Sequence, residues 1–239
     1  MLTHIPLEEI LFLDLETVPA VPDFSQLDEE FQQLWTEKSR FIREKNATSL
    51  EESYHSAGIY AEFGKIVCIG VGYFYRGTSG IAFRCTSFCG DDEKSILKDF
   101  SDLLRKRTND PFRMLCAHNG KEFDFPYLCR RMLINSIDLP TLLDIAGKKP
   151  WEIGHIDTME LWKFGDYKHY TSLKLLAKLF GIPTPKDDID GSQVRQVYWE
   201  EKNIERIASY CRKDVLTTAQ LFLRYQGLPL IEAENIKEV

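Results

Sequence analysis

Residues 10–17 read Ile-Leu-Phe-Leu-Asp-Leu-Glu-Thr, an apolar run typical of a buried β-strand in which two acids stand one residue apart. Side chains alternate across a strand, so Asp14 and Glu16 point to one side while Leu13 and Leu15 point to the other. Two neighbouring carboxylates in an apolar setting require a cation, a shared proton or basic partners, because an unpaired buried charge is unfavourable. A divalent metal ion meets that requirement. For an isolated Asp-x-Glu, the commoner explanation is a strand that leaves the core and exposes both acids to water, so other motifs must decide.

The composition limits the class of protein. The chain has 239 residues, 44% of them hydrophobic, and we expect residues 1–239 to form a single domain with one substantial core. No stretch approaches the roughly 20 apolar residues of a transmembrane helix, and no signal peptide is recognisable, so we expect a soluble protein without a membrane partner. The formal net charge of −7 argues against a general nucleic-acid coating protein. It is compatible with an enzyme that draws one strand end onto metal ions.

The cysteines indicate a reducing environment. No Cys-x-x-Cys pair is present, and several cysteines stand in apolar runs where a free thiol is ordinary core filling. The six are Cys68, Cys85, Cys89, Cys116, Cys129 and Cys211. We therefore expect a cytoplasmic location.

A helical insertion is predicted after the first strand, over about residues 24–62. Pro19 and Pro22 are expected to end the strand and turn the chain into a loop. Residues 24–44 are charged but carry an apolar stripe at helical spacing, and the pattern Ser49-x-x-Glu52 predicts a further short helix. The stripe consists of Phe31, Leu34, Trp35, Phe41 and Ile42. We expect it to face the core, with a partner-binding surface as the alternative.

The remainder of the chain predicts an α/β fold in which strands come first and helices dominate later. β-rich runs predict strands, and apolar spacing with capping residues predicts helices. The strands are expected at 66–74, 81–85, 113–117 and 153–158, and the helices at 91–107, 123–134, 172–180 and 203–225.

Two further acids stand in unusual places. Asp124 lies where a strand ends and a helix begins, which is typical of a ligand but equally of a helix cap or dipole partner. Tyr210 and Asp214 are four residues apart and therefore share one face of the last helix. An exposed face explains Asp214 as well as a buried site does, when these residues are considered alone.

Taken together, Asp-x-Glu, Asn-x-x-x-Phe-Asp and Tyr-x-x-x-Asp in this order resemble the motifs of the DEDD superfamily of 3′-5′ exonucleases, in the subgroup that has Tyr before the last Asp. The surrounding text is similar to the predicted 3′-5′ exonucleases related to the exonuclease domain of family B DNA polymerases. The matching segments are FLDLETVP (12–19), HNGKEFDFPYLCRRM (118–132), PKDDIDGSQV (185–194) and YCRKDVLTTAQLFLR (210–224). Polymerase motifs are absent, so the resemblance implies a free-standing nuclease with a ribonuclease H-like fold, a mixed β-sheet flanked by α-helices.

The resemblance also implies the chemistry. Asp14, Glu16, Asp124 and Asp214 would hold two divalent cations, Mg²⁺ or Mn²⁺, with Asp14 bridging them. Tyr210 would orient the attacking water. The substrate would be the 3′ end of single-stranded DNA or RNA, and the terminal nucleotide would be held by Leu15, Thr17, Asn119 and Phe123.

Other acids rank lower as site candidates. Asp157 is compatible with a supporting role behind the site, although a structural role is favoured. Asp187, Asp188 and Asp190 lie in a polar loop and are interpreted as turn formers.

Two other functions remain compatible with the sequence. One is a catalytically silent nucleic-acid-binding or scaffold domain of the same fold, which the complete set of acids argues against. The other is a metal-dependent phosphohydrolase of small nucleotides, which shares the chemistry and differs in substrate.

Overall fold

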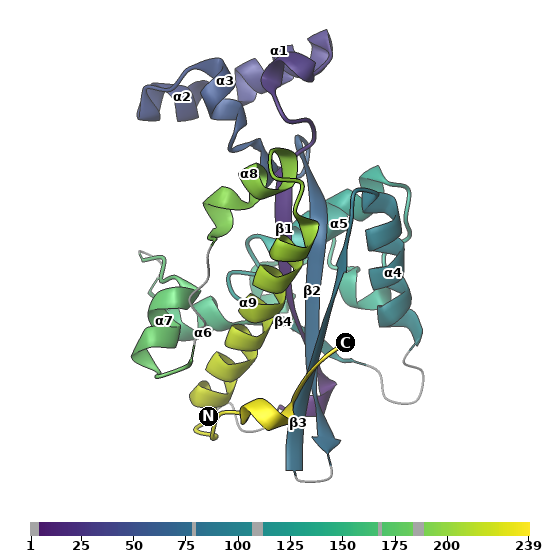
Figure 1. Ribbon diagram of the computed structural model, residues 1–239, viewed down its shortest axis with the longest axis vertical. Helices are drawn as coiled ribbons and strands as arrows, with labels where there is room; N and C mark the ends of the chain where they lie inside the picture. Colours follow the sequence, from purple (N-terminus) through teal and green to yellow (C-terminus); the bar gives the residue numbers. More distant parts are fainter. Residues whose placement is uncertain (1–4, 78–79, 107–111, 167–168, 184–188) are drawn as a thin grey trace.

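The computed structural model describes residues 5–77, 80–106, 112–166, 169–183 and 189–239. Within these ranges six strands form one sheet in the order β5-β4-β1-β2-β3-β6 (Figure 1). The strands are β1 (Ile10–Pro19), β2 (Gly64–Gly77), β3 (Gly80–Cys89), β4 (Met114–Ala117), β5 (Ile156–Asp157) and β6 (Ile236–Glu238). β2 runs antiparallel to β1 and β3, and the other pairs are parallel. The expected mixed sheet flanked by helices is confirmed.

β1 lies inside the sheet, and its two faces pack against different helices. Leu11, Leu13 and Leu15 join the core beneath α4 (Glu93–Lys106) and α5 (Asp124–Ile134). On the opposite face, Ile10 and Phe12 pack against the long helix α9 (Ile204–Tyr225). A strand covered on both faces has few positions for acids, so Asp14 and Glu16 must lie where the cover opens.

Three short elements were not predicted from the sequence. They are α6 (Thr158–Lys163), α8 (Val194–Trp199) and the edge strand β6. Each is too short to show a clear period of hydrophobicity, and tertiary contacts stabilise them instead. The expected helix at 172–180 is present as α7 (Leu173–Leu179), with Ser172 as its N-cap.

The predicted insertion is present and stands at one end of the molecule (Figure 1). It contains α1 (Glu29–Lys38), α2 (Arg40–Asn46) and α3 (Leu50–Tyr54), and α3 opens with the expected capping box of Ser49 and Glu52. The insertion has its own small core, in which Trp35, Tyr54 and Phe63 pack together.

The prediction that the aromatic stripe of the insertion faces the core is wrong for most of its members. Trp35 is fully buried, but Phe31, Leu34 and Phe41 are 41%, 46% and 78% exposed. The chain changes helix at Ser39, so the stripe is divided between α1 and α2 instead of forming one face. Three short helices also enclose too little volume to bury every apolar side chain.

β1 is longer than expected. β1 ends at Pro19, as the prolines predict, but Val18 and Pro19 still pair with β2, so the strand extends two residues beyond Thr17. The register shifts between Glu16 and Thr17, as in a β-bulge. Proline is tolerated at a strand end because the missing N–H interrupts little of the hydrogen-bond ladder.

Two cysteines differ from the expectation of free thiols. Cys68 and Cys89 face each other across β2 and β3 and form a disulfide with an S–S distance of 2.09 Å. Their proximity follows from strand register, which sequence spacing does not reveal. The other four cysteines are free.

Among the described residues, no helix combines the length and the hydrophobicity that a bilayer crossing requires.

Candidate metal centre

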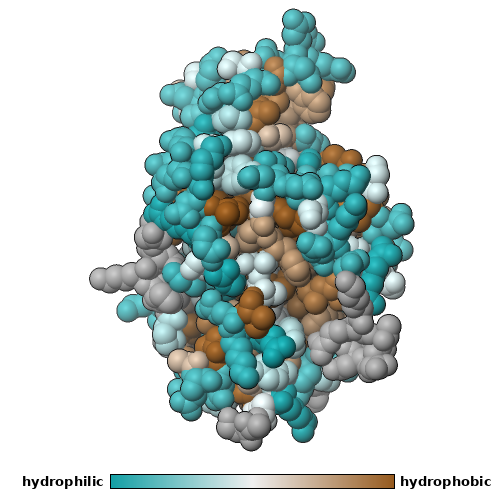
Figure 2. Space-filling model, turned by 45° about the vertical axis from the view of Figure 1, so that its right-hand side comes forward, coloured by the Kyte–Doolittle hydropathy of each residue, from teal (hydrophilic) through white to brown (hydrophobic). Residues whose placement is uncertain are grey.

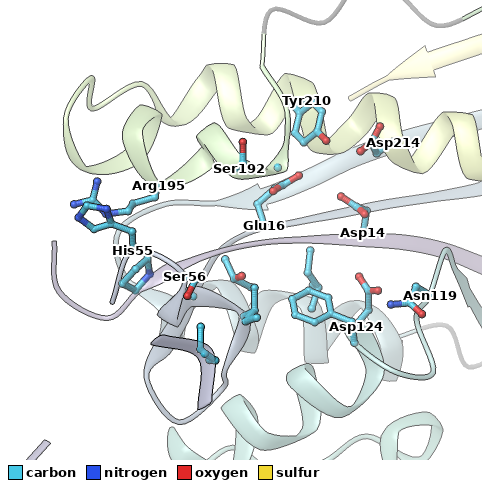
Figure 3. A pocket seen from close by; sticks show the side chains of 18 of the residues that line it. Asp14, Glu16, His55, Ser56, Asn119, Asp124, Ser192, Arg195, Tyr210 and Asp214 are labelled. Carbon is cyan, nitrogen blue, oxygen red and sulfur yellow. The ribbon is translucent and has the colours of Figure 1, made fainter. Parts of the chain in front are cut away.

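The two acids of β1 point toward the α9 side of the sheet and into one pocket (Figure 3). Asp14 pairs with Gly70 on β2, and the thiol of Cys211 on α9 lies 3.5 Å from the Asp14 carboxylate. Glu16, two residues further along, is 6% exposed. The alternation predicted for this strand therefore places both carboxylates on one side.

Gly70 lets α9 approach the sheet closely. A Cβ at this position would lie 2.8 Å from Cys211 Sγ and 2.9 Å from Val215 Cγ2, so no side chain fits without displacing the helix. The N–H of Gly70 instead donates to Cys211 Sγ at 3.1 Å. Because the helix rests on bare backbone here, its acidic side chains reach the carboxylates of β1.

Helix α9 contributes Tyr210 and Asp214, one turn apart on the pocket side (Figure 3). The two side chains are hydrogen-bonded to each other. Arg212 points elsewhere, bonding Ser87 at 2.8 Å and Glu238 at 3.3 Å. The rotation of the helix is therefore set from both sides, by the cores it covers and by Arg212.

Asp157 organises the loop that precedes α5. Its carboxylate accepts hydrogen bonds from the backbone N–H groups of Asn119 (2.9 Å), Lys121 (3.1 Å), Met159 (2.9 Å) and Glu160 (3.2 Å). It thus caps α6 and ties the end of β4 to β5. The structural role favoured for Asp157 from the sequence is confirmed.

Asp124 is the first residue of α5 and is 4% exposed. The turn before it passes through Asn119 in a left-handed conformation, with φ of 66°. The Asp124 carboxylate faces β1 and hydrogen-bonds the backbone of Leu15. Asp124 therefore meets the acids of β1 from the side opposite to α9.

The electrostatics show that folding concentrates negative charge. Burial, followed by the charges of Glu16, Asp214 and Asp124, raises the pKa of Asp14 well above its usual range. Burial and the charges of Asp214 and Asp124 likewise raise the pKa of Glu16. Burial raises the pKa of Asp124 to about 7. Burial, then Asp214 and the acids of β1, raise the pKa of Tyr210, so the phenol keeps its proton.

The donor set fits hard divalent cations. The described ligand atoms of Asp14, Glu16 and Cys211 lie within 4.8 Å of one another, and Asp124 and Asp214 add carboxylates on either side. Carboxylate oxygens are the ligands that Mg²⁺ and Mn²⁺ prefer. Burial raises the pKa of the Cys211 thiol well above its usual range, so it is a protonated neighbour that donates toward Asp14. A cation would relieve the mutual repulsion of the acids.

A pocket of about 790 Å³ contains the acids and extends from them toward the insertion. Every site residue expected from the sequence lines it. These are Asp14, Leu15, Glu16, Thr17, Asn119, Phe123, Asp124, Tyr210 and Asp214. Folding thus brings together residues from three distant parts of the chain, while the roles assigned to them stay predictions.

Other lining residues were not predicted from the sequence to belong to the site. They include His55, Ser56, Ile59, His118, Tyr170, Ser192 and Arg195. Tyr170 lies near the acids. Burial raises the pKa of its phenol, and the charges of Asp124, Asp14 and Asp214 raise it further. His118 and Ser192 stand in segments similar to the exonuclease family but were not assigned to the site, and only the tertiary contact reveals the others.

Of the loop acids, Asp190 is a turn former, as expected. It accepts hydrogen bonds from the N–H and hydroxyl groups of Ser192, at 2.9 and 2.5 Å. Asp187 and Asp188 lie outside the described residues.

Comparison with known proteins yields one protein family and several larger relatives. The sequence profile of a family described as "Predicted 3′-5′ exonuclease related to the exonuclease domain of PolB" matches residues 60–233. DNA polymerase 1 of Pyrococcus abyssi is 25% identical over 228 residues, which cover 85% of this chain and 28% of the polymerase. A DNA polymerase of Pyrococcus glycovorans is 23% identical over 142 residues, covering 54% of this chain and 18% of the polymerase.

A solved structure shares the fold. The family B DNA polymerase from the hyperthermophilic archaeon Pyrobaculum calidifontis superposes with a TM-score of 0.55 at 15% identity, over 92% of this chain and 24% of the polymerase. The chain thus spans less than a third of the length of each of these relatives.

Proposed function

The chain belongs to the family of predicted 3′-5′ exonucleases related to the exonuclease domain of PolB, and we propose on this premise that it is a metal-dependent 3′-5′ exonuclease. Its substrate is the 3′ end of single-stranded DNA, with the 3′ end of single-stranded RNA as the alternative. Hydrolysis releases nucleoside 5′-monophosphates. Residues 1–239 act as one catalytic domain in this proposal.

The observation that carries the proposal is the convergence of four carboxylates from β1, α5 and α9 on one pocket, beside a tyrosine that keeps its proton. Asp14, Glu16, Asp124 and Asp214 would hold the divalent cations. Such cations supply Lewis-acid stabilisation of the scissile phosphodiester and make water a better nucleophile at neutral pH.

The remaining side chains position the reactants. The raised pKa of Tyr210 keeps its phenol protonated at neutral pH, so the phenol can donate a hydrogen bond but cannot accept the proton of the water. It therefore orients the attacking water. The backbone at Leu15 and the side chains of Thr17, Asn119 and Phe123 border the acids and hold the terminal nucleotide.

The burial of the acids also bears on the silent-domain alternative. Clustered carboxylates with raised pKa values destabilise a protein that binds no cation, so a domain without catalysis has no reason to keep them. The second alternative, hydrolysis of small nucleotides, would use the same acids. It differs from the proposed exonuclease only in its substrate.

Digestion of 5′-labelled single-stranded DNA and RNA, with and without Mg²⁺ or Mn²⁺, tests the proposal. We expect a descending ladder that requires metal, and immediate release of mononucleotide from a 3′-labelled strand. Asp14→Ala and Asp214→Ala should each abolish the activity while the circular-dichroism spectrum stays native. Internal cuts in a circular single strand, or near-normal turnover of either variant, would contradict the proposal.

A further inference from the structure

Two chain segments that border the pocket differ in charge. The insertion, residues 24–62, carries eight Asp and Glu residues against four Lys and Arg residues. Residues 163–183, which include α7, carry four Lys residues against a single Asp. α7 lies beside α9 and away from the insertion (Figure 1). A polyanion that extends from the acids is therefore attracted toward α7 and repelled by the insertion.

Tyr170 connects the basic segment to the pocket. Its side chain lines the pocket and is 69% exposed, so the ring is open to a ligand. The charges of Asp124, Asp14 and Asp214 reach its phenol, so the ring lies close to the acids. An exposed aromatic ring beside a basic surface is typical of sites that bind single-stranded nucleic acid.

The backbone that follows Tyr170 is held in place. Nε2 of His118 donates to the carbonyl of Thr171 at 2.9 Å. The next residue, Ser172, caps α7 by accepting a hydrogen bond from the N–H of Leu175 at 3.3 Å. The inner face of α7 packs against α9, the helix that carries two of the site residues. The ring and the helix therefore keep fixed positions relative to the acids.

The outer face of α7 combines positive charge with apolar surface. Lys174 and Lys178 are exposed and stand one turn apart. Leu175 and Leu179, the next residues around the helix, are 51% and 62% exposed. A single-stranded polynucleotide has the complementary pattern, because its charged phosphates alternate with flat bases that are free of a pairing strand.

Lys174 lies near the border of the pocket. Hydrogen bonds from Ser192 lower the pKa of Asp190, and the charge of Lys174 lowers it further, which indicates that the lysine is close to this loop. Ser192 itself lines the pocket. Lys178 stands one helical turn, roughly 6 Å, further along α7. The positive charge thus begins at the pocket and continues away from it.

We propose that Tyr170, Lys174 and Lys178, here called the basic rim, bind the nucleotides on the 5′ side of the scissile bond. Tyr170 stacks on a base, and the two lysines contact backbone phosphates. This inference rests on the proposed function and adds to it the path of the uncleaved strand, which runs along α7 instead of across the insertion.

Binding of a fluorescein-labelled oligodeoxythymidylate of about 12 nucleotides, in the presence of chelator, tests the basic rim without turnover. Fluorescence anisotropy across a salt series gives Kd and the slope of log Kd against log salt concentration. Each phosphate contact contributes about 0.7 to this slope for a single strand, so Lys174→Gln combined with Lys178→Gln should weaken binding and lower the slope by about 1.4.

The matched control is Lys94→Gln combined with Lys98→Gln. These lysines are exposed and one turn apart on α4, which packs against the other face of the sheet. The control removes the same charge at the same spacing, so it should leave Kd and slope close to the wild-type values.

Substitution of Tyr170 tests the stacking contact. Tyr170→Ala should raise Kd about tenfold, which corresponds to the loss of one stacked base. Tyr170→Phe should keep the wild-type Kd, because stacking requires the ring and not the hydroxyl.

An unchanged salt slope in the Lys174→Gln, Lys178→Gln variant, or no binding by the wild type, would overturn the inference. A dimer that Leu175→Asp dissociates would assign the outer face of α7 to a second copy of the chain and overturn it as well. Metal-dependent cleavage of bis(p-nitrophenyl) phosphate, which has no nucleoside, reports the metal centre separately. Failure of the wild type to cleave this ester and single-stranded DNA would reject the proposed function, whereas binding without metal still decides whether the basic rim holds a strand.

Discussion

At the residue scale, the acids of the pocket differ in which neighbours shift their pKa values. Burial is the largest cause of the raised pKa at all three acids; the charges of Glu16, Asp214 and Asp124 add to it at Asp14, those of Asp214 and Asp124 add to it at Glu16, and the hydrogen bond from the backbone of Leu15 lowers the pKa of Asp124. Tyr210 is uncharged, because its raised pKa keeps the phenol protonated. These differences let single substitutions separate metal binding from the positioning of water.

Tyr210→Phe should reduce nuclease activity and leave metal binding nearly unchanged. The substitution removes one hydrogen bond to the water, an effect of roughly 10²-fold to 10⁴-fold at most. Asp214→Ala is the comparison, because it removes a carboxylate and should impair both properties. The measurements are single-turnover rates and the metal-dependent shift in melting temperature. If Tyr210→Phe lost the metal-dependent shift as fully as Asp214→Ala, the tyrosine would be a structural part of the metal centre.

The apo protein should become less stable as the pH rises toward neutrality. The folded pKa of Asp124, about 7, lies above the ordinary value of 3.8, so the native state binds the proton more tightly than the unfolded chain. The resulting stabilisation is complete below about pH 4 and is lost as the pH rises through about 7. Asp14 and Glu16, whose pKa values are also raised, contribute with the same sign.

Urea unfolding of chelator-treated protein between pH 4 and pH 8 measures this dependence. Asp124→Asn should flatten the part of the curve near pH 7, because the amide does not titrate. A wild-type curve that rises over this range, after correction with Asp99→Asn as a surface-acid control, would contradict the burial of these acids. Asp99 is exposed on α4 and lies outside the pocket.

At the element scale, one loop and one helix orient the site. The loop from β4 to α5 is shaped by the carboxylate of Asp157, which binds four backbone N–H groups. Helix α9 is seated by the absence of a side chain at Gly70. Neither residue reaches the pocket, yet both determine where the acids of α5 and α9 lie.

Asp157→Ala should destabilise the protein and displace the residues of the loop from β4 to α5. Hydrogen bonds to a charged acceptor contribute about 1.5–3 kcal/mol each, and their loss leaves buried N–H groups unpaired, so we expect a loss of about 3 kcal/mol or more. Asp190→Ala is the matched control, because Asp190 caps only an exposed turn and should cost about 1 kcal/mol. Chemical denaturation measures both. Equal losses in the two variants would show that Asp157 is an ordinary helix cap.

At the scale of the whole molecule, the acids belong to elements that meet only in the folded state. β1 lies between α5 on one face of the sheet and α9 on the other (Figures 1 and 3). The insertion lines part of the pocket. Figure 2 shows apolar patches between hydrophilic regions on one face of the molecule. A nucleic-acid substrate of a protein with net charge −7 must therefore be held by local contacts and cations more than by an overall positive field.

Mg²⁺ or Mn²⁺ should raise the melting temperature of the wild type in a concentration-dependent manner. Metal binds the native cluster selectively, because the unfolded chain separates the acids. Asp124→Asn should leave the apo protein at least as stable as the wild type, since it removes a repelling charge, and should shrink the gain from metal. Thermal melts with chelator and across a metal titration measure both effects. An equal metal-dependent gain in wild type and variant would show that Asp124 lies outside a shared metal site.

The sequence alone determined the mixed sheet, the helical insertion and the nine pocket residues that carry spaced motifs. Local rules account for part of this: alternation puts Asp14 and Glu16 on one side of a strand, and a four-residue step puts Tyr210 and Asp214 on one face of a helix. The mixed sheet, Asp124 and the four residues assigned to the terminal nucleotide followed from the resemblance to the exonuclease family. The relative positions of side chains within one strand or helix can be predicted from the sequence, because they depend only on neighbours in the chain.

Only the tertiary structure decided which surfaces meet. The insertion's stripe was expected to be buried, yet Phe41 is 78% exposed, since burial depends on how much surface a small cluster can cover. The pairing of Cys68 with Cys89 depends on strand register, and the contribution of His55, Ile59 and Arg195 to the pocket depends on how the insertion and α8 dock onto β1. Contacts between residues distant in the sequence leave no local pattern, because many side chains are compatible with each position along the chain and packing alone selects the partner.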